Sequence, residues 1–226
     1  MAKLLHIETS TTMCSVALSE NETLVAAKEI NEGYTHAENL HVFIQTLLKE
    51  TKTEASDLSA IAVSKGPGSY TGLRIGVSAA KGLAYALKIP LISVDTLQIM
   101  AVQATKTSSH ADYLCPMLDA RRMEVYTAVY DSTLKRRTEI EALIVDENSI
   151  SQFLQYPNIH FFGDGMNKCK SILSQLNHAG FIEGIVPSAK DMVALAYAKY
   201  QNKEFEDVAY FEPFYLKDFL IKSTKA

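Results

Sequence analysis

One segment constrains the fold of this chain more than any other: residues 66–76, Gly-Pro-Gly-Ser-Tyr-Thr-Gly-Leu-Arg-Ile-Gly. It follows a strand-like apolar run at 60–64 and opens a helix-like run that continues to about Lys88. Its glycines and proline impose a special backbone path between strand and helix. Ser69 and Thr71 are suited to cap the helix, where unpaired N–H groups and the positive end of the dipole collect. The segment therefore fits either an anion-binding loop or a capped turn without a ligand.

The spacing of this segment excludes two common nucleotide loops. A Walker A loop continues from its last glycine with Lys and then Ser or Thr, whereas Gly72 is followed by Leu73 and Arg74. The dinucleotide fingerprint G-x-G-x-x-G requires a glycine where this chain has Thr71.

The composition is that of an ordinary globular protein. The chain has 226 residues, enough for one large domain or two smaller ones, and its net charge of −4 argues against a free-standing nucleic-acid binder. Cys14, Cys115 and Cys169 form no C-x-x-C pair and are expected to be reduced thiols. We expect neither a signal peptide nor a membrane span, and hence a cytoplasmic protein.

The first half of the chain opens with strands and continues with helices. Short turns link three strand-like runs, which favours an antiparallel meander. Helical spacing of apolar residues then predicts two helices, and the strands beside them imply a parallel crossover. The expected elements are strands at 3–8, 14–19, 23–30, 60–64 and 91–94 and helices at about 36–50 and 72–88.

The second half repeats this order of elements. We expect strands at 113–118, 124–130, within 137–145 and at 158–162, helices near 147–155, 166–176 and 189–200, and a tail from 209. A β-β-β-α-β-α order that occurs twice predicts two tandem domains, 1–104 and 105–226, joined in the polar stretch 105–110. This is the plan of the actin-like ATPase fold (ASKHA, RNase H-like), of the α/β class.

In that plan the turn after the first strand and the glycine loop meet at the cleft between the domains. This makes a candidate nucleotide or anion loop from Glu8, Thr9, Ser10, Gly66, Gly68, Ser69, Thr71 and Gly72. Glu8 and its counterpart Asp119 each close a first strand, where a carboxylate can hold Mg²⁺ beside a phosphate. The simpler interpretation, which we favour, is that both carboxylates cap turns.

Other catalytic classes find little support. His36 and His41 have one residue too many between them for the H-x-x-x-H metal pair of a helix. Ser78 lacks the second glycine of a nucleophile elbow and lies inside the predicted helix. We therefore predict neither a metal site nor a covalent nucleophile.

The predicted helix at 72–88 has more apolar surface than one contact with a sheet requires. One face is the expected sheet contact, and a second face carries small side chains that allow another helix to approach closely. This second face consists of Ile75, Ala79, Gly82 and Ala86. The helix at 36–50 covers it fully, or leaves part of it as an exposed partner surface.

Four segments carry a resemblance to a known family. They are residues 5–11 (Leu-His-Ile-Glu-Thr-Ser-Thr), 66–76, 118–126 (Leu-Asp-Ala-Arg-Arg-Met-Glu-Val-Tyr) and 212–217 (Glu-Pro-Phe-Tyr-Leu-Lys). In this order, and over essentially its whole length, the chain resembles the bacterial TsaB (YeaZ) family. Glu8 stands where that family often has Asp, and Lys217 where it often has Arg; both keep the charge.

The resemblance implies a non-catalytic subunit required for threonylcarbamoyl transfer to adenosine 37, beside the anticodon of tRNAs that read codons beginning with A. Its partners would be a TsaD-like transferase, which is a metal-bearing paralogue, and a TsaE-like ATPase, with tRNA met only through the complex. The resemblance also places the TsaD contact on the first two helices, which here means Ile75, Ala79, Gly82 and Ala86 with His41 and Val42. The glycine loop would then be vestigial, with no required cofactor and at most weak nucleotide binding. The same apolar face can form a homodimer when the protein is alone.

Two other classes stay open at this point. The actin-like fold also suits a phosphotransferase or a metallohydrolase (glycoprotease-like) that acts alone. A direct tRNA-binding module is the second alternative, and the acidic net charge counts against it.

Overall fold

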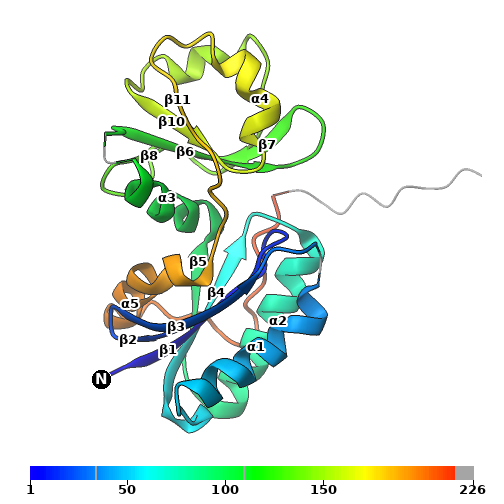
Figure 1. The fold of residues 1–226 in the computed structure, drawn as a ribbon, viewed down its shortest axis with the longest axis vertical. Coiled ribbons are helices and arrows are strands. Elements are labelled where there is room, and N and C mark those ends of the chain that lie inside the picture. The colour runs from blue at the N-terminus through cyan, green and yellow to red at the C-terminus, as the bar shows by residue number, and fades with distance from the viewer. Residues whose placement is uncertain (34, 109, 217–226) are drawn as a thin grey trace, which may run out of the picture.

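A computed structural model describes residues 1–33, 35–108 and 110–216. Ser109 of the expected junction, and Lys217 with the rest of the expected tail, lie outside the described residues. Two sheets with their helices lie one above the other along the long axis of the molecule, and helix α3 (Thr96–Thr107) lies between them (Figure 1). No helix in the described parts of the chain is long and apolar enough to cross a bilayer.

The first sheet has the strand order β3-β2-β1-β4-β5. Its strands are β1 (Lys3–Glu8), β2 (Cys14–Glu20), β3 (Thr23–Ile30), β4 (Leu58–Gly66) and β5 (Leu91–Asp95). The first three pair antiparallel through short turns, whereas β4 and β5 are parallel to β1 because helical crossovers precede each of them. Helices α1 (His36–Glu50) and α2 (Tyr70–Leu87) cover one face and bury a core that includes Leu5, Leu47 and Val77.

The second sheet repeats this order as β9-β7-β6-β10-β11. Its strands are β6 (Tyr113–Asp119), β7 (Glu124–Thr127), β9 (Glu141–Ile144), β10 (Ile159–Phe162) and β11 (Gly180–Ile182), and the short β8 (Tyr130–Asp131) also pairs with β6. The β9–β7 and β7–β6 pairs are antiparallel and the β6–β10 and β10–β11 pairs are parallel, which is the same sequence of pairings as in the first sheet. The predicted internal repeat is therefore present, and each copy carries one more parallel strand beyond its β-β-β-α-β-α order.

Several predicted elements of the second half differ in the structure. The helix expected at 147–155 is a short 3₁₀ helix at Ser149–Phe153, and helix α4 (Met166–Leu173) ends before 176. The strand expected at 124–130 is interrupted after Thr127, because residues 130–131 pair with β6 as β8. Strand β11 was not predicted.

Helix α3 corrects the expected junction. The polar stretch at 105–110 was interpreted as a loop, yet α3 continues to Thr107, so a boundary after residue 104 falls inside a helix. Leu97, Met100 and Ala101 pack with the second sheet, whereas Ile99 packs with the first. A helix buried on opposite sides has no polar face, which is why its sequence shows no amphipathic period.

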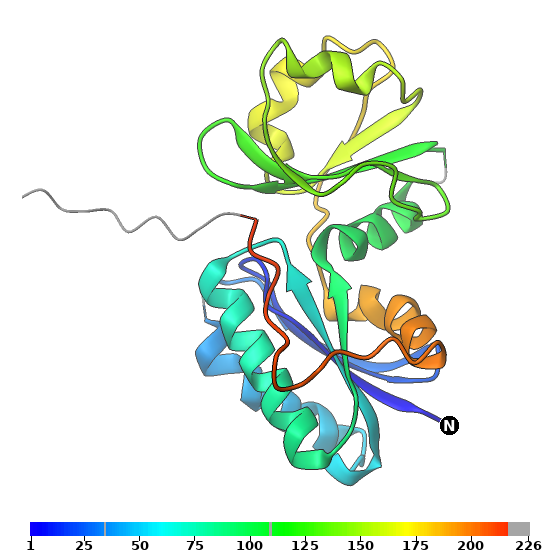
Figure 2. The ribbon, with the colours of Figure 1, turned by 180° about the vertical axis from the view of Figure 1, so that it is seen from behind.

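The last helix returns to the first sheet. A 3₁₀ turn at Ala189–Met192 leads into α5 (Val193–Gln201), and Met192 and Ala196 pack on Ala60 and Ile92 of that sheet. Residues 189–201 thus lie with the first sheet, although the chain order placed them with the second half. Figure 2 shows α5 and the segment that follows it on this part of the molecule.

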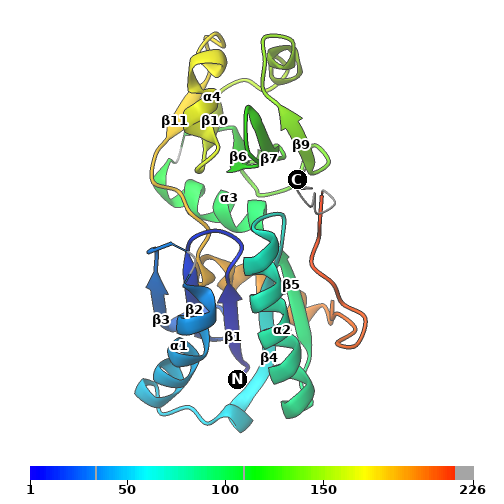
Figure 3. The same ribbon diagram turned by 90° about the vertical axis from the view of Figure 1, so that its right-hand side faces the viewer.

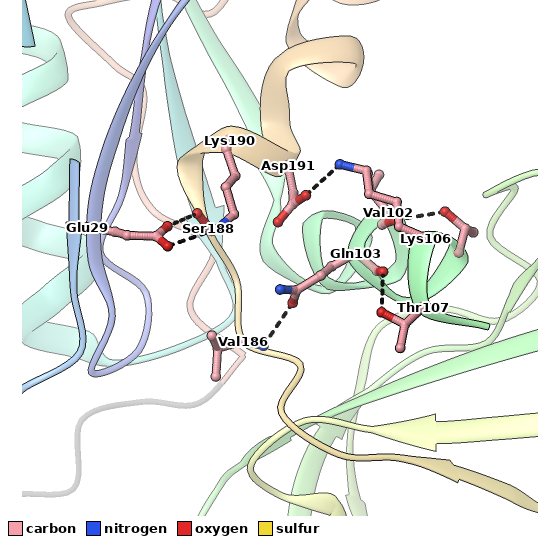
Figure 4. Close-up of polar contacts among 10 residues, drawn as sticks. Glu29, Val102, Gln103, Lys106, Thr107, Val186, Ser188, Lys190 and Asp191 are labelled. Atoms are coloured by element: carbon pink, nitrogen blue, oxygen red, sulfur yellow. Dashed lines mark hydrogen bonds and ion pairs between the residues drawn. The ribbon is translucent and has the colours of Figure 1, made fainter. Parts of the chain in front are cut away.

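Polar contacts fasten this return segment to its neighbours (Figure 4). Glu29 accepts hydrogen bonds from the Ser188 hydroxyl at 2.8 Å and from Lys190 Nζ at 2.9 Å. Lys106 Nζ of α3 lies 2.8 Å from the buried carboxylate of Asp191. The backbone N–H of Val186 donates to the Gln103 side chain of α3 at 3.0 Å. Two segments connect the sheets, namely α3 and the stretch that leads to Ala189, and this bond joins them to each other.

Candidate functional site

The glycine loop begins where β4 ends at Gly66 and leads into α2 at Tyr70, two residues before the predicted start. Gly66 has φ +111°, a conformation that side chains other than glycine rarely adopt. Ser69 is the N-cap, and its Oγ accepts a hydrogen bond from the Gly72 N–H at 3.2 Å. Thr71, the other predicted cap, lies inside the helix and is exposed.

The turn after β1 packs directly into this loop. The Ser69 N–H donates to the Ser10 carbonyl at 2.6 Å, and the Thr9 hydroxyl donates to the Gly72 carbonyl at 2.7 Å. A Cβ on Gly68 would lie 2.3 Å from the Ser10 carbonyl oxygen, and a Cβ on Gly72 would lie 2.1 Å from that of Thr9. The glycines are therefore required for close approach of the protein's own backbone.

Glu8 lies buried at the base of this joint. Its Oε1 accepts a hydrogen bond from the Ser10 N–H at 2.5 Å. Burial raises the pKa of Glu8 to about 7, although hydrogen bonds from Ser10 oppose the shift. The Glu8 side chain is fully buried in this joint.

Asp119, the counterpart of Glu8 at the end of β6, is exposed. It forms an ion pair with Lys168, and it accepts a hydrogen bond from the Arg121 N–H at 2.7 Å. Each carboxylate therefore caps a turn by bonding the N–H two residues further on, as the simpler interpretation of the sequence had it.

The histidines occupy separate environments. His36 is buried, and its Nε2 lies 2.7 Å from the Thr11 carbonyl oxygen, whereas His41 is exposed on α1. In residues 1–33, 35–108 and 110–216, no group of three or more His, Cys, Asp or Glu side chains could hold a metal ion. A pocket of about 530 Å³ lies between the end of β5 and the loop at 136–139, and its walls include Asp95 and Tyr130 but no residue of the glycine loop.

Helix α2 is covered along its polar side by the segment that follows α5. Lys81 Nζ donates to the carbonyl oxygens of Ala209 at 3.1 Å and Phe211 at 2.8 Å, and the Phe214 N–H donates to the Lys65 carbonyl at 2.7 Å. This segment reaches the glycine loop, which the sequence alone did not reveal. It leaves Gly82 and Ala86 of α2 exposed.

Gly82 and Ala86 belong to the predicted partner face. Ile75 and Ala79 are half-buried against the first core, while Gly82 and Ala86 are exposed, and a Cβ on Gly82 would meet no atom within 4 Å. His41 and Val42 are exposed on α1, which lies beside α2 (Figure 3). Tyr85 of α2 is also 80% exposed and adds apolar surface beside Ala86.

Comparison with known proteins connects this geometry to a process. Residues 32–223 match the family described as TsaD: tRNA N6-adenosine threonylcarbamoyltransferase. The chain is 30% identical over 224 residues to the tRNA threonylcarbamoyladenosine biosynthesis protein TsaB of Escherichia coli, covering 96% of this chain and 95% of that protein. It is 36% identical to the Bacillus subtilis protein of the same name, over 64% of this chain and 61% of that one.

Solved structures agree with these sequence matches. The structure described as YeaZ from Pseudomonas aeruginosa superposes with a TM-score of 0.81 at 28% identity, covering 96% of this chain and all of that one. Component A of (R)-2-hydroxyglutaryl-CoA dehydratase from Acidaminococcus fermentans superposes with a TM-score of 0.51 at 7% identity, over 90% of this chain and 100% of that one, which shows a shared fold alone. Together with the repeated strand order, these matches confirm the predicted actin-like fold.

Proposed function

The chain belongs to the TsaB (YeaZ) family, and on that premise we propose that it is the non-catalytic partner subunit in tRNA threonylcarbamoyladenosine formation. In this role it binds a TsaD-like transferase, its paralogue, which modifies the adenosine next to the anticodon in tRNAs that read codons beginning with A. A TsaE-like ATPase joins the pair. The site of action is the cytoplasm, in agreement with three buried cysteines that are free thiols.

The observation that carries the proposal is the uncovered small-residue face of α2. Gly82 and Ala86 expose backbone that a helix of a partner can approach closely, and the exposed side chains of Val42 and Tyr85 offer apolar area beside them. A paralogue with the same fold presents two comparable helices. Contact through this face therefore forms a four-helix interface between like subunits.

The internal packing of the glycine loop supports a subunit without chemistry of its own. Thr9 and Ser10 occupy the loop, and Lys168 neutralises Asp119, so the two turns that would cradle a phosphate are engaged in internal contacts. We therefore assign the reaction to the transferase and assign no cofactor to this chain.

Size-exclusion chromatography of this chain with its TsaD-like paralogue tests the proposal. Co-migration at micromolar concentration is expected for the wild type, and it should be lost in Ala79→Glu and Gly82→Arg, which place charge on the face. Ala198→Glu, on the exposed side of α5, is the matched control and should bind normally.

Two results would count against this assignment. Normal binding by the folded Ala79→Glu and Gly82→Arg variants would remove the proposed face. ATP turnover by the chain alone, without the paralogue, would favour a phosphotransferase or a metallohydrolase instead. If the protein without its paralogue elutes as a dimer that Gly82→Arg dissociates, the same face serves as the homodimer contact.

A further inference from the structure

The turn between β6 and β7 holds two arginines in a backbone conformation that arginine rarely adopts. Arg121 has φ +73° and Arg122 has φ +46°, both in the left-handed region. Hairpin turns of this kind are normally occupied by Asn and Gly, because a Cβ is unfavourable there. Two consecutive arginines therefore cost folding free energy, and such strain in a native turn points to a use for the side chains.

The structure supports this strained turn from below. The Asp119 carboxylate accepts a hydrogen bond from the Arg121 N–H at 2.7 Å. Lys168 forms an ion pair with Asp119 and donates to the Glu124 carbonyl at 2.7 Å, on the other strand of the hairpin. These contacts fix the backbone of the turn and use none of the guanidinium groups.

Arg121 and Arg122 are both exposed, and neither forms an ion pair with a described residue. Arg136 and Arg137 differ in this respect, because they pair with Glu139 and Asp131. The Asp119 carboxylate lies close enough to interact electrostatically with Arg121, but Lys168 already pairs with it. In a chain of net charge −4, the exposed pair of guanidinium groups is a local positive patch. Guanidinium groups bind phosphate oxygens in a planar, two-bond geometry.

A second cluster combines a cation with aromatic rings at the start of α2. The Arg74 guanidinium lies 4.0 Å from the centre of the Tyr70 ring and 6.0 Å from that of Tyr215, and the two rings are 4.9 Å apart. Arg74 Nε donates to the Tyr215 hydroxyl at 3.3 Å, and Arg74 forms no ion pair with a described carboxylate. Phe214 beside it is 39% exposed. The Tyr70 and Tyr215 rings are half-buried, and aromatic rings next to a cation suit stacking with nucleic acid bases.

The two clusters lie on the same side of the molecule. The β6–β7 turn belongs to the second sheet and the N-terminus of α2 to the first, and Figures 1 and 3 agree in placing both on the side that Figure 3 turns toward the viewer. The Arg121–Arg122 turn supplies positive charge for phosphates, and the cluster at the start of α2 supplies positive charge together with aromatic rings.

We infer that the Arg121–Arg122 turn and the Tyr70–Arg74–Tyr215 cluster form one RNA-contact surface, which binds the phosphate backbone and unpaired bases of tRNA within the assembled complex. This rests on the proposed function, which brings the chain to a tRNA. An acidic protein would satisfy the arginines but leave the rings without a role. The overall negative charge keeps the affinity of the lone chain low, so the contact has its effect when the transferase holds the same RNA.

The test measures tRNA affinity of the complex with the TsaD-like paralogue over a series of salt concentrations. Arg121→Gln/Arg122→Gln should reduce the slope of log K against log salt by about 2, since each lost phosphate contact removes about one unit. Co-migration with the paralogue should not change. Lys203→Gln is the matched control, because Lys203 is also an exposed cation with positive φ, +58°, and follows α5.

Arg121→Asn/Arg122→Gly separates binding from folding. These residues suit the left-handed turn, so this variant should melt at a higher temperature than wild type while losing the same slope. An unchanged slope in both double variants would overturn the inference. So would unchanged tRNA binding with loss of the TsaE-like ATPase from the complex, which would make the surface a protein contact. If the wild-type chain does not assemble with the TsaD-like paralogue, the proposed function fails and the inference is tested separately. The salt slopes of tRNA binding are then compared between the wild-type chain and its variants, without the paralogue and at low salt.

Discussion

Replacing Gly72 by alanine tests whether the glycine loop is a packing joint of the fold. The new Cβ would lie 2.1 Å from the Thr9 carbonyl oxygen, a backbone atom that cannot rotate away. Overpacking of this kind costs roughly 1–3 kcal/mol. Displacing Thr9 also breaks its 2.7 Å hydrogen bond to Gly72, which costs roughly 0.5–1.5 kcal/mol more. Alanine's higher helix propensity returns roughly 0.5–1 kcal/mol, so the net destabilisation is about 2 kcal/mol.

The same substitution later in α2 provides the control. A Cβ on Gly82 meets nothing within 4 Å, so Gly82→Ala retains only the propensity gain of roughly 0.5–1 kcal/mol. For a chain of this size 1 kcal/mol shifts Tm by roughly 2–4 °C, so Tm should fall by about 4–8 °C in Gly72→Ala and rise slightly in Gly82→Ala. Thermal unfolding followed by far-UV circular dichroism measures both. Equal Tm values for Gly72→Ala and wild type would refute the close-packed joint.

Three further predictions concern charge and backbone. Burial raises the pKa of Glu8 from 4.5 to about 7, so its contribution to stability is complete below pH 4.5 and is lost as pH rises through 7. One pKa unit corresponds to about 1.4 kcal/mol, so the free energy of unfolding of the wild type should fall by about 3 kcal/mol relative to that of Glu8→Gln between pH 4.5 and pH 8. Urea unfolding at a series of pH values measures this, and parallel pH profiles of the two proteins would contradict it. Lys88 ends α2 with φ +56°, so Lys88→Gly should gain about 1 kcal/mol in thermal unfolding while Lys88→Ala gains nothing. Lys106→Met leaves the buried Asp191 carboxylate without its cation and should lower the free energy of unfolding by about 3 kcal/mol. Lys190→Met removes only a half-exposed pair with Glu29 and should lower it by less than about 1 kcal/mol. Urea unfolding measures both, and similar losses for the two variants would count against the role of Asp191 burial.

Much of the fold was predictable because local physics determines it. The short turns after Glu8 and Glu20 leave β1, β2 and β3 no arrangement except an antiparallel meander, and helical crossovers make β4 and β5 parallel. The second half obeys the same rules, so its strand order followed from the repeat. The meeting of the first turn with the glycine loop was also predicted, and the hydrogen bond from the Ser69 N–H to the Ser10 carbonyl confirms it.

What the sequence did not reveal depends on contacts between distant segments. Helix α3 was missed because it is buried between two sheets and therefore lacks a polar face. The return of α5 to the first sheet depends on packing such as that of Met192 on Ile92, which no local pattern encodes. The loop's glycines were open to two interpretations, since only the structure shows that the Thr9 backbone occupies the space beside Gly72.

Reconstituted threonylcarbamoyl transfer tests the central claim most directly. Purified TsaD-like transferase and TsaE-like ATPase are supplied with tRNA, ATP and threonylcarbamoyl-AMP, and this chain is titrated into the mixture. The account predicts no sustained modification without the chain, a rise that saturates at stoichiometric amounts of it, and no rise with Gly82→Arg. Full modification without the chain, or transfer by the chain alone, would contradict the account.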